Sequence, residues 1–221
     1  GIRVHGNVAT NSLFPSINIL GNFIGTDKSG ASAIPNETGL SVVYADGVNI
    51  GGESVLGRNI ISGNTENGIQ VKALIADGTE MGYPVVGLTI QNNYIGTTAN
   101  GSSALGNGAN GIALLDYMPD ALITGNTISG NTQNGIYSLF DYEDIPTDSM
   151  SILANKIGTK PDGTGNLGNG AKGIELMGKG EITIGAVGQG NITKNSGDGI
   201  KFNDPPSLAI PEGPPSSNLT G

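Results

Sequence analysis

The chain of 221 residues has no cysteine and no tryptophan, and only 5% of its residues are aromatic. Without cysteine it can form no disulfide, no thiolate metal site and no cysteine nucleophile. No apolar run approaches the ~18 residues needed to cross a bilayer. The chain has ten Lys and Arg and nineteen Asp and Glu, which give a net charge of −9. Charge of that sign disfavours capture of nucleic acid or of an anionic lipid surface. The sequence therefore predicts neither nucleic-acid binding nor membrane insertion.

Glycine and asparagine are what the chain has in abundance, with 38 Gly and 24 Asn. Both are poor helix formers and good turn formers, which disfavours a helical bundle or a doubly wound α/β fold. The glycines show no three-residue period, so the composition is not that of collagen. An all-β fold with many turns remains.

A long repeat organises the chain. The tetrapeptides GIRV, GIQV, GIYS and GIKF stand 67, 67 and 64 residues apart, and they begin at Gly1, Gly68, Gly135 and Gly199. Within each unit an apolar-x-apolar motif recurs about three times, which gives a sub-period near ~22 residues, the size of one coil of a parallel β-solenoid. We therefore predict about ten coils, which at ~4.8 Å spacing form a rod ~48 Å long.

Alternation within the motifs predicts which side chains point inward. One column contains Ile2, Ile69, Ile136 and Ile200, another Ile19, Ile90 and Ile152, and a third Ile24, Ile95 and Ile157. Asparagines also recur at fixed phase, and stacked side-chain amides can hydrogen-bond from coil to coil. We expect a structural ladder from Asn22, Asn93, Asn155, Asn64, Asn131 and Asn195.

The string GN-x-IGT, followed by ALGNG-x-NGI and N-x-ISGN-x-x-NGI, resembles the repeat of right-handed parallel β-helix proteins of the pectin-lyase-like superfamily. It is most similar to the long repetitive secreted or surface proteins of bacteria, and the resemblance covers essentially the whole chain. It implies a three-faced right-handed coil, secretion, and contact with carbohydrate or another surface. Members of the superfamily include polysaccharide lyases, glycoside hydrolases and epimerases as well as non-catalytic stalks and adhesins.

The catalytic motifs of the enzymes in that superfamily are missing here. The sequence has no NTD, paired Asp, GHG or RIK motif of polygalacturonase-like hydrolases and no DPH-type motif of uronan epimerases. A pectate-lyase-like site needs an arginine base beside several calcium-binding Asp. Arg58 has no Asp within ten residues of it in sequence, and the one histidine is His5. We therefore expect a non-catalytic protein.

Variable loops follow each GI strand, over residues 7–16, 74–84, 141–148 and 203–217. Loops on a rigid scaffold are where binding residues concentrate. Aromatic rings stack on sugars, and paired carboxylates hydrolyse glycosides. The binding candidates are Asp77, Glu80, Tyr83, Phe140, Tyr142 and Asp148, and the catalytic candidates, if the protein is an enzyme, are Asp141, Glu143 and Asp144. The alternative, that these acids only form a solvated surface, stays open.

The sequence thus predicts a single β-helix domain over residues 1–221, cut from a longer extracellular or cell-surface protein. Since neither end resembles a cap, we expect neighbouring domains or self-association to cover the ends. The expected function is a structural stalk or adhesin-like segment that binds a polysaccharide or a partner surface. The alternative is a polysaccharide lyase or glycoside hydrolase. We expect no cofactor, and a weaker alternative is a calcium ion between Asp141, Glu143 and Asp144.

Overall fold

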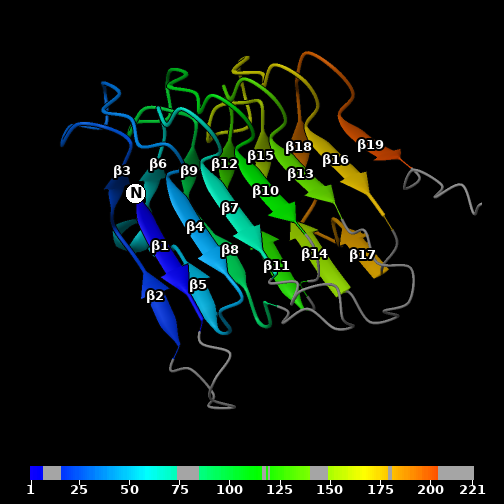
Figure 1. Cartoon of the computed structure of the whole chain (residues 1–221). Coiled ribbons are helices and arrows are strands. Elements are labelled where there is room, and N and C mark those ends of the chain that lie inside the picture. The colour runs from blue at the N-terminus through cyan, green and yellow to red at the C-terminus, as the bar shows by residue number, and fades with distance from the viewer. Residues whose placement is uncertain are drawn as a thin grey trace, which may run out of the picture.

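The computed structural model describes residues 1–6, 16–73, 85–115, 118, 120–139, 149–178 and 181–203. Its strands form three parallel sheets that are the faces of a parallel β-helix (Figure 1). Sheet A contains β1 (Ile2–His5), β4 (Leu40–Val43), β7 (Ile69–Lys72), β10 (Ile112–Leu115), β13 (Ile136–Leu139), β16 (Ile174–Met177) and β19 (Ile200–Asn203). Sheet B contains β2 (Ile17–Ile19), β5 (Val48–Ile50), β8 (Thr89–Gln91), β11 (Ala121–Thr124), β14 (Ser149–Leu153) and β17 (Glu181–Ile184).

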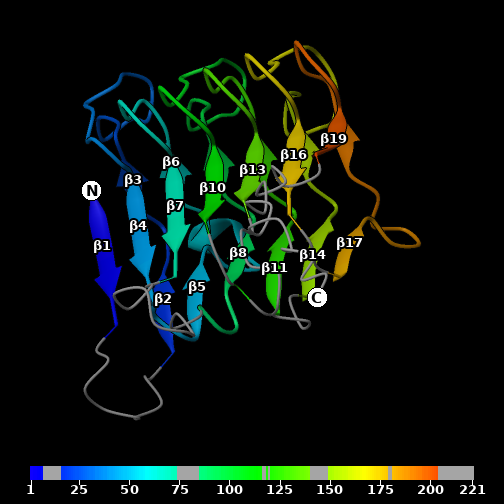
Figure 2. The same cartoon turned by 45° about the vertical axis from the view of Figure 1, so that its right-hand side comes forward.

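Sheet C has the shortest strands, two residues each. It contains β3 (Phe23–Ile24), β6 (Ile60–Ile61), β9 (Tyr94–Ile95), β12 (Thr127–Ile128), β15 (Lys156–Ile157) and β18 (Ile192–Thr193). One 3-10 turn, η1 (Val55–Gly57), precedes β6. The chain visits sheets A, B and C in turn, so that neighbours within a sheet are one coil apart, as the strands of sheet A show in Figure 2.

The coils alternate in length. Strands of sheet A begin at residues 2, 40, 69, 112, 136, 174 and 200, so successive coils take 38, 29, 43, 24, 38 and 26 residues. Each repeat unit is therefore one long coil followed by one short coil. The prediction of ten coils of ~22 residues is wrong, because the described strands make six coils and the first strand of a seventh. Six steps of ~4.8 Å give a rod of about 29 Å.

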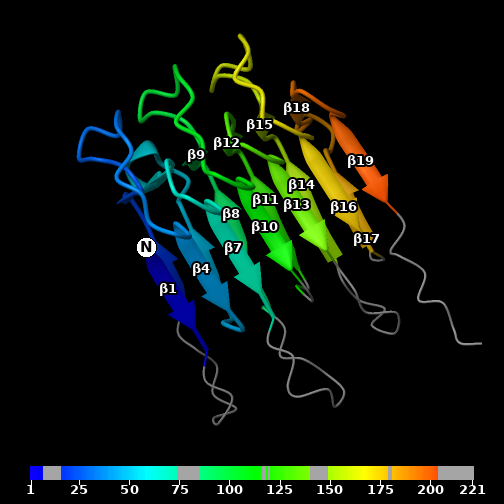
Figure 3. The same ribbon diagram turned by 45° about the horizontal axis from the view of Figure 1, so that its top comes forward.

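A hairpin in each long coil explains the error. After the IGT motif the chain folds back on itself, with antiparallel bridges Thr26–Ala33 and Thr97–Ala104. These residues have the turn-rich composition of a coil but add no level to the rod. The hairpins lie in a row along the rod (Figure 3), and Ala99 N–H of the second donates to Gly30 O of the first, 3.0 Å away.

The predicted inward columns are confirmed. Ile69, Ile90 and Ile95 have no exposed surface, and the same columns continue through the short coils in a single apolar core. Full burial ends before the last described strand: no residue of β17 or β18 is fully buried, and in β19 Ile200 is 42% exposed and Phe202 is 67% exposed. In sheet A one inward position carries a hydroxyl: Ser138 is fully buried, and its Oγ has no hydrogen-bond partner among the described residues.

The first asparagine ladder occupies the turn between sheets B and C, with one rung in each of the six coils. In every step the backbone N–H and the Nδ2 of one asparagine donate to the Oδ1 of the asparagine in the next coil, at 2.9–3.2 Å. The rungs are Asn22, Asn59, Asn93, Asn126, Asn155 and Asn191. The three rungs predicted for this ladder are thus confirmed, and the short coils supply the other three.

A second ladder of the same polarity occupies the turn between sheets C and A. Its rungs are Asn36, Asn64, Asn107, Asn131, Asn169 and Asn195. The glycine of each IGT motif lies against this ladder with positive φ, for example 86° at Gly96. A Cβ on Gly96 would collide with Ser129 O and with Asn131 Oδ1. Only glycine therefore lets the backbone approach the amides this closely.

Candidate binding groove on sheet A

Alternation puts two columns of side chains on the outer face of sheet A. The first column comprises Arg3, Ser41, Gln70, Ala113, Tyr137, Glu175 and Lys201, and the second His5, Val43, Lys72, Leu115, Leu139, Met177 and Asn203. Two hollows of about 540 and 430 Å³ lie over the first three strands, β1, β4 and β7. Both are lined by Arg3, Ser41 and Gln70, so together they form one groove, here named the sheet A groove.

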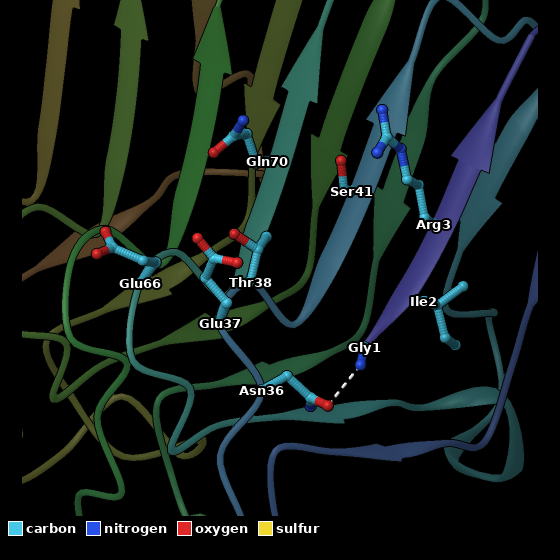
Figure 4. A pocket seen from close by; sticks show the side chains of 9 residues that line it. All are labelled: Gly1, Ile2, Arg3, Asn36, Glu37, Thr38, Ser41, Glu66 and Gln70. Atoms are coloured by element: carbon cyan, nitrogen blue, oxygen red, sulfur yellow. Dashed lines mark hydrogen bonds between the residues drawn. The ribbon is translucent and has the colours of Figure 1, made fainter.

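The larger hollow carries two carboxylates at the corner between sheets C and A. Glu37 and Glu66 occupy the same position in successive coils, and Glu66 N–H donates to Glu37 O at 2.8 Å. Figure 4 shows Thr38 beside Glu37, and the Arg3 side chain extending from β1 toward Ser41 on β4. This end of the groove combines two acids with hydroxyl and amide groups.

The smaller hollow is basic. Arg3, His5 and Lys72 line it and are all exposed. The His5 Nδ1 lies 3.1 Å from the Tyr44 hydroxyl, and the two rings meet edge to face with centroids 4.5 Å apart, which fixes the imidazole against the corner. Among the described residues, neither Arg3 nor Lys72 takes part in a salt bridge. Two positive charges therefore face solvent in a chain whose net charge is −9.

At the opposite end of sheet A, polar side chains form hydrogen bonds with one another instead. The carboxylate of Glu175 accepts hydrogen bonds from Lys172 Nζ and Asn203 Nδ2, both at 2.8 Å, and from Asn134 Nδ2 at 3.0 Å. Burial opposes ionisation of Glu175, but these hydrogen bonds and the charge of Lys172 outweigh it and lower its pKa. Burial and then the Glu175 charge raise the pKa of Tyr137. This network links neighbouring coils, whereas the cations Arg3 and Lys72 of the sheet A groove are exposed.

The smaller, basic hollow suits a negatively charged group, and the larger hollow, which carries the two carboxylates, suits hydroxyl groups. Arg3 and Lys72 can pair with a carboxylate or sulfate, and Arg does so in a bidentate manner. Gln70, Ser41 and the two glutamates can exchange hydrogen bonds with hydroxyls. Across the part of the chain that the structure describes, no three His, Asp or Glu side chains are grouped so that they could hold a metal ion.

The binding and catalytic candidates of the variable loops lie outside the described residues. These are Asp77, Glu80, Tyr83, Phe140, Tyr142 and Asp148, and Asp141, Glu143 and Asp144. Sequence reasoning missed the groove residues Arg3, Glu37, Glu66, Gln70 and Lys72. Three of these five occupy outward positions of the GI strands, which the alternation of those strands could have indicated.

Comparison with protein-family models, with curated proteins and with solved structures found no match. The described segments also contain no helix of the length and apolarity needed to span a membrane.

Proposed function

We propose that this chain is a non-catalytic, rigid segment of an extracellular or cell-surface protein, a stalk or adhesin-like module that contacts a polysaccharide or a partner surface. The proposal includes a right-handed coil and kinship with bacterial repeat proteins of the pectin-lyase-like superfamily. The observation that carries it is the pair of asparagine ladders, which bond every coil to the next along the whole described rod. Such a rod holds its loops and its outer face in fixed register, as a binding surface requires.

The sheet A groove supports a more specific ligand class. Its exposed cations Arg3 and Lys72 lie two coils apart, so a chain of sugars with carboxylate or sulfate groups could contact both. The variable loop sequences follow β1 and β7 directly along the chain, and in this proposal they extend the contact.

Affinity electrophoresis tests directly whether the groove binds an acidic polysaccharide. The full chain is run through gels that contain polygalacturonate, alginate, a sulfated galactan or neutral dextran. We expect retardation by at least one acidic polymer, weakened in Arg3→Ala and Lys72→Ala. The matched control is Lys28→Ala, which removes an exposed cation from the first hairpin, away from the groove. Equal retardation of all variants, or retardation by dextran alone, would show that the groove cations play no part.

The alternative function is a carbohydrate-active enzyme with acids from the variable loops. The same polysaccharides are incubated with the chain, with and without calcium, and new reducing ends and unsaturated products are measured. Depolymerisation that is abolished in Asp141→Ala, Glu143→Ala or Asp144→Ala would replace the non-catalytic proposal with a lyase or hydrolase. Absence of product with retained binding would favour the stalk or adhesin.

The exposed apolar side chains of the last described strand bear on the partners of the rod. Ile200 and Phe202 continue two core columns yet remain accessible. We propose that neighbouring domains or self-association cover them, because an apolar solenoid end in water is an aggregation hazard.

A further inference from the structure

The described residues contain six Asn–Gly pairs, and these dipeptides carry an intrinsic chemistry. The backbone nitrogen of the following residue can attack the asparagine Cγ, and glycine hinders that attack least because it has no side chain and a permissive backbone. Asparagine is correspondingly a thermolabile residue. The pairs begin at Asn67, Asn100, Asn107, Asn110, Asn134 and Asn169.

In five of these pairs the fold restrains both the nucleophile and the leaving group. The Nδ2 of each asparagine donates a hydrogen bond, and the N–H of each following glycine donates to a carbonyl in an adjacent coil at 2.8–3.0 Å. Asn107 is typical: its Nδ2 donates to Asn131 Oδ1 at 2.8 Å, and Gly108 N–H donates to Asn64 O at 2.8 Å. Attack in any of these pairs first requires the stacked coils to separate.

Asn100 differs in every one of these respects. It is exposed at the tip of the second hairpin. Its Oδ1 accepts hydrogen bonds from Thr98 Oγ1 at 2.7 Å, Ser102 Oγ at 2.8 Å and Ser102 N–H at 3.0 Å. These bonds polarise the side-chain carbonyl, while among the described residues its Nδ2 donates to none. The N–H of Gly101 is bonded only within the same turn, to Thr98 O.

We propose that Asn100 is a site of spontaneous deamidation, selected by the fold from the six pairs. The Gly101 nitrogen loses its proton and forms a bond to the Asn100 Cγ, the Cγ–Nδ2 bond breaks, and ammonia leaves. Water then opens the resulting cyclic imide at either carbonyl and yields aspartate or isoaspartate. The reaction consumes water, releases ammonia, and needs no oxidant, reductant or cofactor.

The equivalent turn of the third long coil, in which Lys160 N–H donates to Thr164 O at 2.9 Å, shows that the aspartate product fits here. There Asp162–Gly163 stands where the second hairpin has Asn100–Gly101. The Oδ1 of Asp162 accepts from Thr164 N–H at 2.8 Å and from Thr164 Oγ1 at 2.7 Å. Conversion to aspartate therefore keeps the turn and adds one negative charge. Isoaspartate adds a methylene to the backbone instead, which displaces the bond from Thr98 N–H to Ser103 O.

Timed incubation in mildly alkaline buffer followed by peptide mapping with mass spectrometry tests the proposal. We expect deamidation at Asn100 first, at least about tenfold faster than at the other five pairs, because those need local opening. Ser102→Ala, which removes one polarising bond, should slow the reaction at Asn100. In concentrated urea the six pairs should react at similar rates. Equal rates in the folded chain, or faster reaction at a stacked pair, would overturn the proposal.

Discussion

Replacing Asn93 with alanine tests whether the amide ladder, and not apolar packing alone, holds the coils together. The Asn93 side chain has no exposed surface. Its Oδ1 accepts from Asn59 N–H at 3.2 Å and from Asn59 Nδ2 at 2.9 Å. Its Nδ2 donates to Ile50 O at 2.8 Å and to Asn126 Oδ1 at 3.1 Å. The substitution thus removes four hydrogen bonds from the interior of the rod.

The magnitude follows from these contacts. A hydrogen bond contributes about 1 kcal/mol net, and a buried group left without a partner costs about 1–3 kcal/mol. Alanine leaves two donors of Asn59 and the carbonyl of Ile50 without their Asn93 partners. We therefore expect Asn93→Ala to lower the free energy of unfolding by roughly 4 kcal/mol.

The first rung supplies a matched control. Asn22 is only half-buried, and its side chain donates to Leu20 O and Asn59 Oδ1 without accepting from another coil. Asn22→Ala should cost about 1 kcal/mol. Urea unfolding followed by far-UV circular dichroism measures both variants, compared at equal m-value. If Asn93→Ala proves no more costly than Asn22→Ala, the buried rungs of the ladder do not stabilise the rod.

Three further predictions follow from other positions. Ser138→Ala removes a buried hydroxyl without a partner, so calorimetry should show a gain of about 1 kcal/mol, or ~2–4 °C in Tm; a lower Tm contradicts this. Gly96→Ala should lower the free energy of unfolding in urea by more than about 2 kcal/mol, because the alanine would keep a left-handed φ and its Cβ would collide with the neighbouring coil. Gly87 also has a left-handed φ, 68°, but open space around it, so Gly87→Ala should lower that free energy by only about 1–2 kcal/mol. A hydrogen bond from Ser29 and others from nearby backbone N–H groups lower the pKa of Asp27, so the contribution of this carboxylate to its hairpin is present at neutral pH and is lost as pH falls through the folded pKa. Ser29→Ala should raise that pKa in an NMR titration, and an unchanged value would contradict the assignment.

The sequence was sufficient for the fold class and for the inward columns, because both depend on local alternation and on spacing. Ile19, Ile90 and Ile152 share a column in the structure as the repeat predicted. The ladders were predicted only at every second rung. Alignment of whole 67-residue units compares long coils with long coils and short with short, so Asn22 and Asn59 never stand at the same phase.

The number of coils and the groove needed the structure. A hairpin such as the one closed by Thr26 and Ala33 has the same glycine-rich composition as a coil, and only its antiparallel bridge distinguishes them. The groove depends on which outward side chains remain without partners. Arg3 and Glu175 occupy the same column, yet Glu175 is enclosed by three hydrogen-bond donors and Arg3 is exposed.

The alternation of long and short coils also determines how such a rod can change length during evolution. Hairpins of successive long coils already contact each other, through Ala99 and Gly30, at a spacing of two coils, or roughly 10 Å. Loss of a single short coil would bring two hairpins to adjacent levels ~5 Å apart, too close for loops that each contain two strands of backbone. Gain or loss of a complete long and short pair leaves every column, ladder and hairpin contact in place. We therefore expect related rods to differ in length by whole units of about 67 residues.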